Sequence, residues 1–248
     1  MIPTIGFGTY RINDQSVIEN AIKCGYNHFD TAELYKNEYI VKQAIDKYPD
    51  IKIYVTTKIS RKSIEMGSEG ILKSFNERLS IFPYIDILLL HVPSKNCRKD
   101  WDQLTELYLQ NKHRIGHIGV SNYSIEHLKQ LEGSVVKPYC NQIELSPFYT
   151  RVDLVNYLRT NNIIVVSHTT LTRTEKFGNQ YLICISKKYG VSVASILLQW
   201  ALQNNYIIIP KANSKEHQIE NRHLDFEIEE NDLVLLNNLN ENFYITKV

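Results

Sequence analysis

The sequence has almost no net charge and no long hydrophobic run. Its 28 Lys and Arg residues nearly balance 27 Asp and Glu residues, which gives a formal charge of +1 at pH 7. Nucleic acids and anionic membranes usually bind basic proteins, so neither is expected as a partner. No apolar run is long enough to span a bilayer, and the first residues, MIPTIGFGTY, contain no basic stretch followed by an apolar one. We therefore expect a soluble, cytoplasmic, monomeric protein.

Cysteines are few and unpaired in spacing. The four are scattered without a CxxC pair: Cys24, Cys97, Cys140 and Cys184. This pattern excludes a disulfide framework and a zinc knuckle, and it fits a reducing compartment. Several histidines also lack the spacing of metal ligands: His113, His117, His127 and His223. No metal site is predicted.

The chain contains no linker, Pro/Gly-rich divider or change of composition, so residues 1–248 are predicted to form one domain. Short β-type runs alternate eight times with amphipathic helical stretches, and the strands are expected at 4–9, 28–32, 53–59, 85–91, 116–122, 140–145, 163–169 and 206–212. One long helical stretch is expected over 181–203, and an outer helix within 229–242. Eight strand-helix pairs in about 250 residues predict an α/β fold with a parallel sheet closed as a (β/α)₈ barrel.

A doubly wound open sheet is the alternative architecture. It requires a glycine-rich phosphate turn after the first strand. The segment GFGTY at 6–10 lacks the third glycine of that motif. The barrel therefore fits better.

Ionisable residues end three consecutive predicted strands. Asp30 ends the second, Lys58 lies at the end of the third, and His91 ends the fourth, while Tyr35 lies in the loop after the second. In a barrel these positions share the rim on which active sites are built. A buried charge without a partner is costly, so we expect these side chains to contact one another.

The four residues are suited to carbonyl reduction. A tyrosine hydroxyl, with a reference pKa of about 10, gives up its proton more readily beside an ammonium, because a positive charge favours the phenolate. Lys58 supplies that ammonium, and Asp30 keeps it protonated and oriented. His91 steers a substrate oxygen toward Tyr35. The missing hydride donor is a nicotinamide cofactor, because no side chain supplies a hydride.

Each residue also has a structural alternative. An Asp after a strand can cap a turn, and a Tyr can cover a rim. Ser121 and Asn122 can form an ordinary turn into a helix. Gln142 is a stronger candidate, because a polar amide inside a barrel strand needs a partner.

Motifs along nearly the whole chain carry a family resemblance. They are GFGTY at 6–10, FDTAELYKNE at 29–38, TTK at 56–58, LLLHVP at 88–93, GVSNYS at 119–124, NQIELSP at 141–147, IIPKA at 208–212 and IEN at 219–221. In this order and spacing the sequence resembles the aldo-keto reductase family. The resemblance implies the catalytic roles argued above for four residues: Asp30, Tyr35, Lys58 and His91.

The resemblance further implies NADPH as cofactor, with NADH possible as a second one. It places Ser121, Asn122 and Gln142 at the nicotinamide carboxamide. Lys211, Glu220 and Asn221 fall at the adenosine end. Other expected cofactor contacts are Gly8, Thr9, Tyr10, His168, Leu171 and His217.

The chain departs from the family pattern at several positions. Only three residues precede the first strand, where the family usually has a β-hairpin that plugs the barrel, so an open barrel floor is expected. His168 replaces the tyrosine that usually stacks on the nicotinamide, although it can instead only fill the rim. His217 replaces an arginine that binds the adenosine phosphate, and Ala212 replaces a serine.

The segments that usually enclose the substrate are short, and Val92 replaces a tryptophan after the catalytic histidine. Tyr10, Val92 and Tyr123 are the expected pocket walls. The predicted function is NAD(P)H-dependent reduction of an aldehyde or ketone, with broad and weak specificity. A cofactor-binding regulatory or redox-sensing subunit, and a decayed reductase, are the alternatives. The sequence does not identify the substrate.

Overall fold

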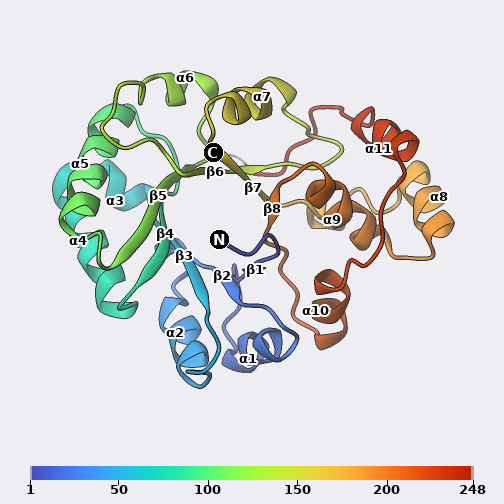
Figure 1. The fold of residues 1–248 in the computed structure, drawn as a ribbon, viewed down its shortest axis with the longest axis horizontal. Helices are drawn as coiled ribbons and strands as arrows, with labels where there is room; N and C mark the ends of the chain where they lie inside the picture. Colours follow the sequence, from blue (N-terminus) through green and yellow to red (C-terminus); the bar gives the residue numbers. More distant parts are fainter. Residues whose placement is uncertain (1, 247–248) are drawn as a thin grey trace.

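The computed structural model describes residues 2–246 and contains one eight-stranded parallel sheet in the order β1 to β8 (Figure 1). Its strands are β1 (Phe7–Gly8), β2 (His28–Asp30), β3 (Tyr54–Ile59), β4 (Ile85–Leu90), β5 (Ile115–Ser121), β6 (Cys140–Glu144), β7 (Ile164–His168) and β8 (Ile207–Ile208). A parallel bridge between Ile5 and Ile208 joins the last strand to the first. The sheet is therefore closed, and the predicted (β/α)₈ barrel is confirmed.

Helices surround the barrel, and α11 lies beside α8 and α9 (Figure 1). They are α1 (Gln15–Lys23), α2 (Glu38–Asp46), α3 (Arg61–Glu65), α4 (Gly67–Ile81), α5 (Cys97–Gln110), α6 (Ile125–Lys129), α7 (Val152–Thr160), α8 (Gln180–Tyr189), α9 (Val193–Gln203), α10 (Lys215–Arg222) and α11 (Glu230–Asn237). Two 3₁₀ turns, η1 (Glu33–Tyr35) and η2 (Thr172–Thr174), lie in the loops after β2 and β7. At least one helix connects each strand to the next, and α10 and α11 follow β8. Because all the strands are parallel, the strand-to-helix loops lie at one rim.

The single helix expected over 181–203 is wrong, because this stretch forms α8 and α9. Gly190 ends α8 in the left-handed conformation with φ of 65°, which glycine adopts without a Cβ clash. Ser192 then caps α9 by accepting a hydrogen bond from the Ser195 backbone N–H at 3.0 Å. Together the two helices are as long and apolar as a membrane span but are bent by 86°, and no single helix within residues 2–246 has that length and composition.

Alternation along the strands separates two apolar layers. In β4, Ile87 and Leu89 belong to a cluster inside the barrel, whereas Leu88 and Leu90 pack outward against the helices. In β2, Phe29 faces the helix layer in the same way. Because side chains alternate along a strand, Asp30 is on the opposite face, inside the barrel.

The barrel floor is only partly open. Ile2 is 7% exposed and packs on the inner cluster of Ile87, Leu89, Cys140, Val166 and Ile207. Beside it lies a cavity of about 410 Å³, lined by the strand starts of β3 to β6 through residues such as Tyr54, Asp86 and His117. The N-terminal residues thus cover part of the floor.

Candidate active site

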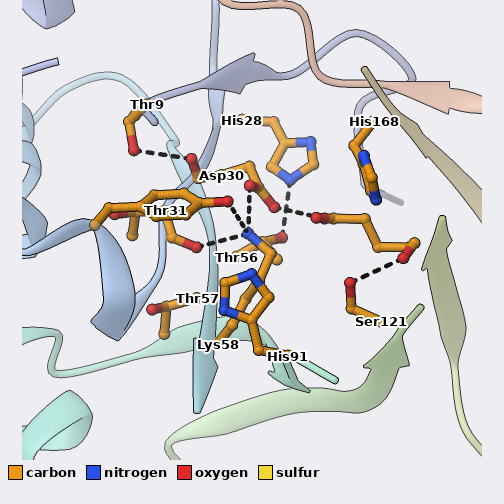
Figure 2. Close-up of polar contacts among 12 residues, drawn as sticks. Thr9, His28, Asp30, Thr31, Thr56, Thr57, Lys58, His91, Ser121 and His168 are labelled. Atoms are coloured by element: carbon orange, nitrogen blue, oxygen red, sulfur yellow. Dashed lines mark hydrogen bonds and ion pairs between the residues drawn. The ribbon is translucent and has the colours of Figure 1, made fainter. Parts of the chain in front are cut away.

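A buried lysine is the centre of the polar cluster at the barrel rim (Figure 2). The Lys58 ammonium donates to Asp30 Oδ1 at 2.5 Å, to the Thr31 carbonyl at 2.8 Å and to the Tyr35 hydroxyl at 3.5 Å. Its side chain is fully buried. An ammonium has three N–H groups, and each has one acceptor here. The structure thus brings Asp30, Tyr35 and Lys58 together.

Asp30 is held through both its carboxylate and its backbone carbonyl. Its second oxygen, Oδ2, accepts from Gln142 Nε2 of β6 at 2.7 Å. Its backbone carbonyl accepts from the Thr9 N–H and the Thr9 hydroxyl, both at 2.9 Å. Just before Thr9, a Cβ on Gly8 would lie 2.6 Å from the Ile209 carbonyl oxygen, so only glycine allows the residue after β8 to approach this closely.

Burial controls the protonation of Tyr35. It raises the pKa of Tyr35 more than the neighbouring Lys58 ammonium lowers it, so the net shift is upward. The sequence predicted the direction of the Lys58 effect but not the larger effect of desolvation. For Lys58, burial lowers the pKa, but Asp30 and Tyr35 outweigh burial, and the net shift is also upward. At neutral pH the site holds a neutral phenol beside a charged ammonium.

His91 lies at the mouth of the cluster, with its ring edge toward Tyr35 and the ring centroids 5.8 Å apart. Burial, followed by the charge of Lys58, lowers its pKa to about 3, so the imidazole is neutral. Within residues 2–246, its buried Nδ1 has no hydrogen-bond partner. An unpaired acceptor is less costly than an unpaired donor, which favours the tautomer that carries its proton on Nε2.

His168, at the end of β7, is joined to Asn122. Its Nε2 lies 2.9 Å from Asn122 Oδ1, and its Nδ1 lies 2.9 Å from the Thr169 hydroxyl. Asn122 Nδ2 donates to the His91 carbonyl at 3.2 Å and to the Ser121 hydroxyl at 3.1 Å. Burial, then Lys58, lowers the pKa of His168 to about 3. A neutral His168 therefore donates from Nε2 and fixes the orientation of the Asn122 amide.

The predicted pocket walls have different environments. Tyr10 is 40% exposed, with its ring 5.0 Å from that of Tyr35, and Val92 is half-buried. Tyr123 is fully buried in the outer core, with its ring 5.7 Å from His127 of α6. The expectation that Tyr123 lines the pocket is wrong, because its side chain points into the helix layer.

The residues expected at the adenosine end lie farther along the rim, at β8 and α10. Lys211 follows β8 and is exposed. His217 is also exposed, in the first turn of α10, where its N–H donates to the Ser214 hydroxyl at 3.3 Å. Glu220 is half-buried and Asn221 is buried. Leu171 precedes η2 and packs against the core.

No sequence pattern indicated the C-terminal strap formed by residues 240–246. The Glu144 carboxylate at the end of β6 accepts from the Ile245 N–H at 2.8 Å and from the Thr246 N–H at 2.7 Å. The Phe148 carbonyl accepts from the Phe243 N–H at 3.0 Å. Since Glu144 is in register with His168, the strap ends beside the rim cluster. The segment after α11 thus returns to the barrel mouth (Figure 1).

Comparisons with known proteins agree with this geometry. Residues 4–240 match the sequence model of the Aldo/keto reductase family. Glyoxal reductase of Bacillus subtilis (strain 168) is 32% identical, over 97% of this chain and 90% of the relative.

Two solved structures have the same fold. MGS-M4, an aldo-keto reductase enzyme from a Medee basin deep-sea metagenome library, superposes with a TM-score of 0.93 and 28% identity, over 100% of this chain and 94% of the other. A mutant of Gox0644 in complex with NADPH gives a TM-score of 0.91 and 28% identity, over 99% of this chain and 92% of the other. The chain belongs to the aldo/keto reductase family.

Proposed function

We propose that this protein reduces small aldehydes and ketones with NADPH, with Tyr35 as the general acid. The observation that carries the proposal is the threefold contact of the buried Lys58 ammonium with Asp30, the Thr31 carbonyl and the Tyr35 hydroxyl. Stability alone would be served as well by a carbonyl group as the third acceptor in place of the Tyr35 hydroxyl. The contact with a phenol at the barrel mouth suits proton donation to a substrate oxygen.

Each side chain has a separate part in the proton transfer. Tyr35 donates its proton to the carbonyl oxygen, and Lys58 stabilises the negative charge that forms on the phenol oxygen. Asp30 keeps the ammonium charged and directed, so Lys58 is not an unpaired buried cation. His91 is neutral and carries its proton on Nε2, from which it donates a hydrogen bond to the same carbonyl oxygen.

The residues beside this cluster fit a nicotinamide cofactor. Ser121 ends β5, Asn122 follows it, and Gln142 lies on β6, so amide and hydroxyl groups gather next to the acid. The bond from Gln142 Nε2 to Asp30 fixes this amide and leaves its carbonyl oxygen to accept from a carboxamide. The cofactor supplies the hydride for the carbonyl carbon. Lys211 and His217 are the proposed contacts of its adenosine phosphate.

The proposed substrates are small dicarbonyls such as glyoxal, for which the Bacillus subtilis relative is named. Tyr10, which is 40% exposed, and Val92 provide little enclosing surface. Remote binding energy is therefore small, and an electrophilic carbonyl that reacts without it is favoured. Bulky ketones should be poorer substrates.

A fluorescence titration with NADPH, followed by NADPH oxidation assays with glyoxal, methylglyoxal and a bulky aromatic ketone, tests the proposal. We expect saturable binding and turnover fastest with the dicarbonyls. Binding without turnover would instead indicate a cofactor-binding regulatory or redox-sensing subunit. Absence of both would indicate a decayed reductase.

A further inference from the structure

Tyr35 lies on a short turn with few bonds of its own. Its N–H donates to the Ala32 carbonyl at 2.9 Å, and the Lys36 N–H donates to the Glu33 carbonyl at 3.3 Å. Lys36 is in the left-handed region with φ of 57°, and no side chain caps the start of η1. The Tyr35 hydroxyl reaches Lys58 only at 3.5 Å. A small shift of this turn would break that contact.

One side of the turn is fastened to the loop after β1 by Asn37. Its Nδ2 donates to the Thr9 carbonyl at 2.7 Å and to the Ile12 carbonyl at 2.8 Å. Its Oδ1 accepts from the Thr31 hydroxyl at 3.0 Å. These bonds hold the turn only on the side that faces β1, so a different residue must hold the opposite side.

The opposite side is fastened to α3 and α4 by the Glu33 carboxylate. Oε2 accepts from the Ser60 N–H and the Ser74 hydroxyl, each at 2.7 Å, and Oε1 accepts from the Ser63 hydroxyl at 2.7 Å. Arg78 Nη1 of α4 lies 3.2 Å from Oε2. Four groups from other elements thus converge on one side chain two residues before Tyr35.

Arg78 is itself held from a second direction, which makes it a fixed attachment point. Its side chain is 6% exposed, and its Nε lies 3.1 Å from Oε2 of Glu38. Glu38 also accepts from the Thr57 hydroxyl of β3 at 2.5 Å. Since Arg78 keeps Glu38 as a partner, removal of the Glu33 charge does not leave a buried guanidinium without any counter-ion.

We propose that Glu33 is a positioning residue for Tyr35, which holds the Tyr35 turn against α3 and α4 so that the hydroxyl stays within reach of Lys58. The inference rests on the proposed role of Tyr35 as the acid. The four contacts to Glu33 are all made with its carboxylate oxygens, so their full strength requires Glu33 to be ionised. Burial raises the pKa of Glu33, but the Ser60 N–H, the Ser63 and Ser74 hydroxyls and the Arg78 charge together outweigh burial and lower it.

Two substitutions at Glu33 test the proposal. Glu33→Gln keeps the length of the side chain and one acceptor oxygen. Glu33→Ala removes every hydrogen bond that the side chain accepts. We expect kcat for glyoxal reduction to fall about 10-fold in the Gln variant and up to about 100-fold in the Ala variant, since a misplacement of about 1 Å can cost that much. The NADPH dissociation constant should stay within about twofold. Glu19→Gln is the matched control, because Glu19 is a similarly exposed carboxylate that pairs with Lys47 on the outside of α1.

Hydrogen exchange measured by mass spectrometry gives a readout that does not need activity. Amides in the peptide covering 31–38 should exchange faster in both Glu33 variants than in the wild type and in Glu19→Gln, with the rest of the barrel unchanged. Wild-type kcat and unchanged exchange in Glu33→Gln and Glu33→Ala would overturn the inference. A wild-type protein without reductase activity would overturn the proposed function instead, and the exchange of 31–38 would still decide whether Glu33 anchors the turn. If Glu33→Ala does not fold, the isosteric Gln variant carries the test.

Discussion

The Lys58 ammonium has two kinds of contact: those that stabilise a buried charge, and one with the proposed acid, Tyr35. Taking a charge out of water costs several kcal/mol, and Lys58 is fully buried. Its bonds to Asp30 and to the Thr31 carbonyl offset that cost. The third N–H is directed at the Tyr35 hydroxyl, where structural stability alone would require only another backbone carbonyl.

Replacement of the acid tests this interpretation. Tyr35→Phe keeps the ring packed against Tyr10 but removes the proton. We expect kcat for glyoxal to fall about 10²- to 10⁴-fold, which is the usual contribution of a general acid, while the NADPH dissociation constant changes little. Tyr39→Phe is the control, because Tyr39 is 67% exposed on α2. Retention of more than half the wild-type kcat in Tyr35→Phe would exclude Tyr35 as the proton donor.

We propose that the cofactor preference depends on His217, an exposed residue of α10. His217 offers the adenosine phosphate at most one hydrogen bond when neutral, whereas an arginine binds a phosphate through two parallel bonds. His217→Arg should therefore raise the ratio of kcat/KM for NADPH to that for NADH by about fivefold, which corresponds to about 1 kcal/mol at an exposed site. His223→Arg adds the same charge at the other end of the helix and serves as the control. Equal ratios in both variants would mean that His217 does not contact the phosphate.

The sequence predicted which residues form the rim cluster better than it predicted their contacts with other elements. Asp30, Lys58 and His91 were found because ionisable side chains at buried strand ends need partners. Glu33 was missed because its partners, Ser60, Ser74 and Arg78, come from helices whose placement no local pattern gives. Tyr123 was misplaced for a similar reason, since the position of a residue after a strand does not fix the direction of its side chain.

At the level of elements, the strap shows what local patterns do not reveal. The bond from the Ile245 N–H to Glu144 joins residues 101 positions apart. The short segments around the barrel mouth indicated an open site. The buried Glu144 carboxylate at the end of β6 instead holds residues 240–246 beside that mouth.

Loosening the strap should affect the substrate more than the cofactor. Glu144→Gln keeps one acceptor oxygen but turns an N–H group toward one of the two strap amides, so at least one charge-assisted bond is lost. We expect KM for glyoxal to rise about fivefold, with the NADPH dissociation constant within about twofold. Steady-state kinetics and the fluorescence titration measure the two quantities. Glu126→Gln, on the outside of α6, is a suitable control. An unchanged KM with weaker NADPH binding would place the strap over the cofactor.

For the whole molecule, the barrel was predictable because its eight strands each carry a strong apolar signal and alternate regularly with helices. The break between α8 and α9 was less visible, since the apolar spacing continues across Gly190. The floor could not be predicted from length alone. Ile2 packs on the inner cluster without a hairpin, and a cavity remains next to it.

The interior of this barrel also makes its stability depend on pH. His28 of β2 is 2% exposed, and its Nε2 lies 2.9 Å from the Thr56 hydroxyl. Its Nδ1 is one of the buried atoms without a partner within residues 2–246, and a Cβ on Gly6 would lie 2.6 Å from it. Burial lowers the pKa of His28 from 6.5 to about 4. Between pH 6.5 and about 4, the ring is therefore neutral in the folded state and protonated in the unfolded chain.

The unfolded state binds the proton first, so the stability supplied by a neutral His28 is present above pH 6.5 and is lost as the pH falls toward about 4. The loss is at most about 1.4 kcal/mol per pH unit, or about 2 kcal/mol between pH 7 and pH 5. His28→Gln removes this proton while it keeps a polar side chain beside Thr56. Urea unfolding of both proteins at pH 7 and pH 5 measures the difference. We expect the wild type to lose about 2 kcal/mol more than the variant over this range, whatever the stability of the variant at pH 7. Equal losses in the two proteins would mean that His28 accepts a proton inside the folded barrel, against the burial that surrounds it.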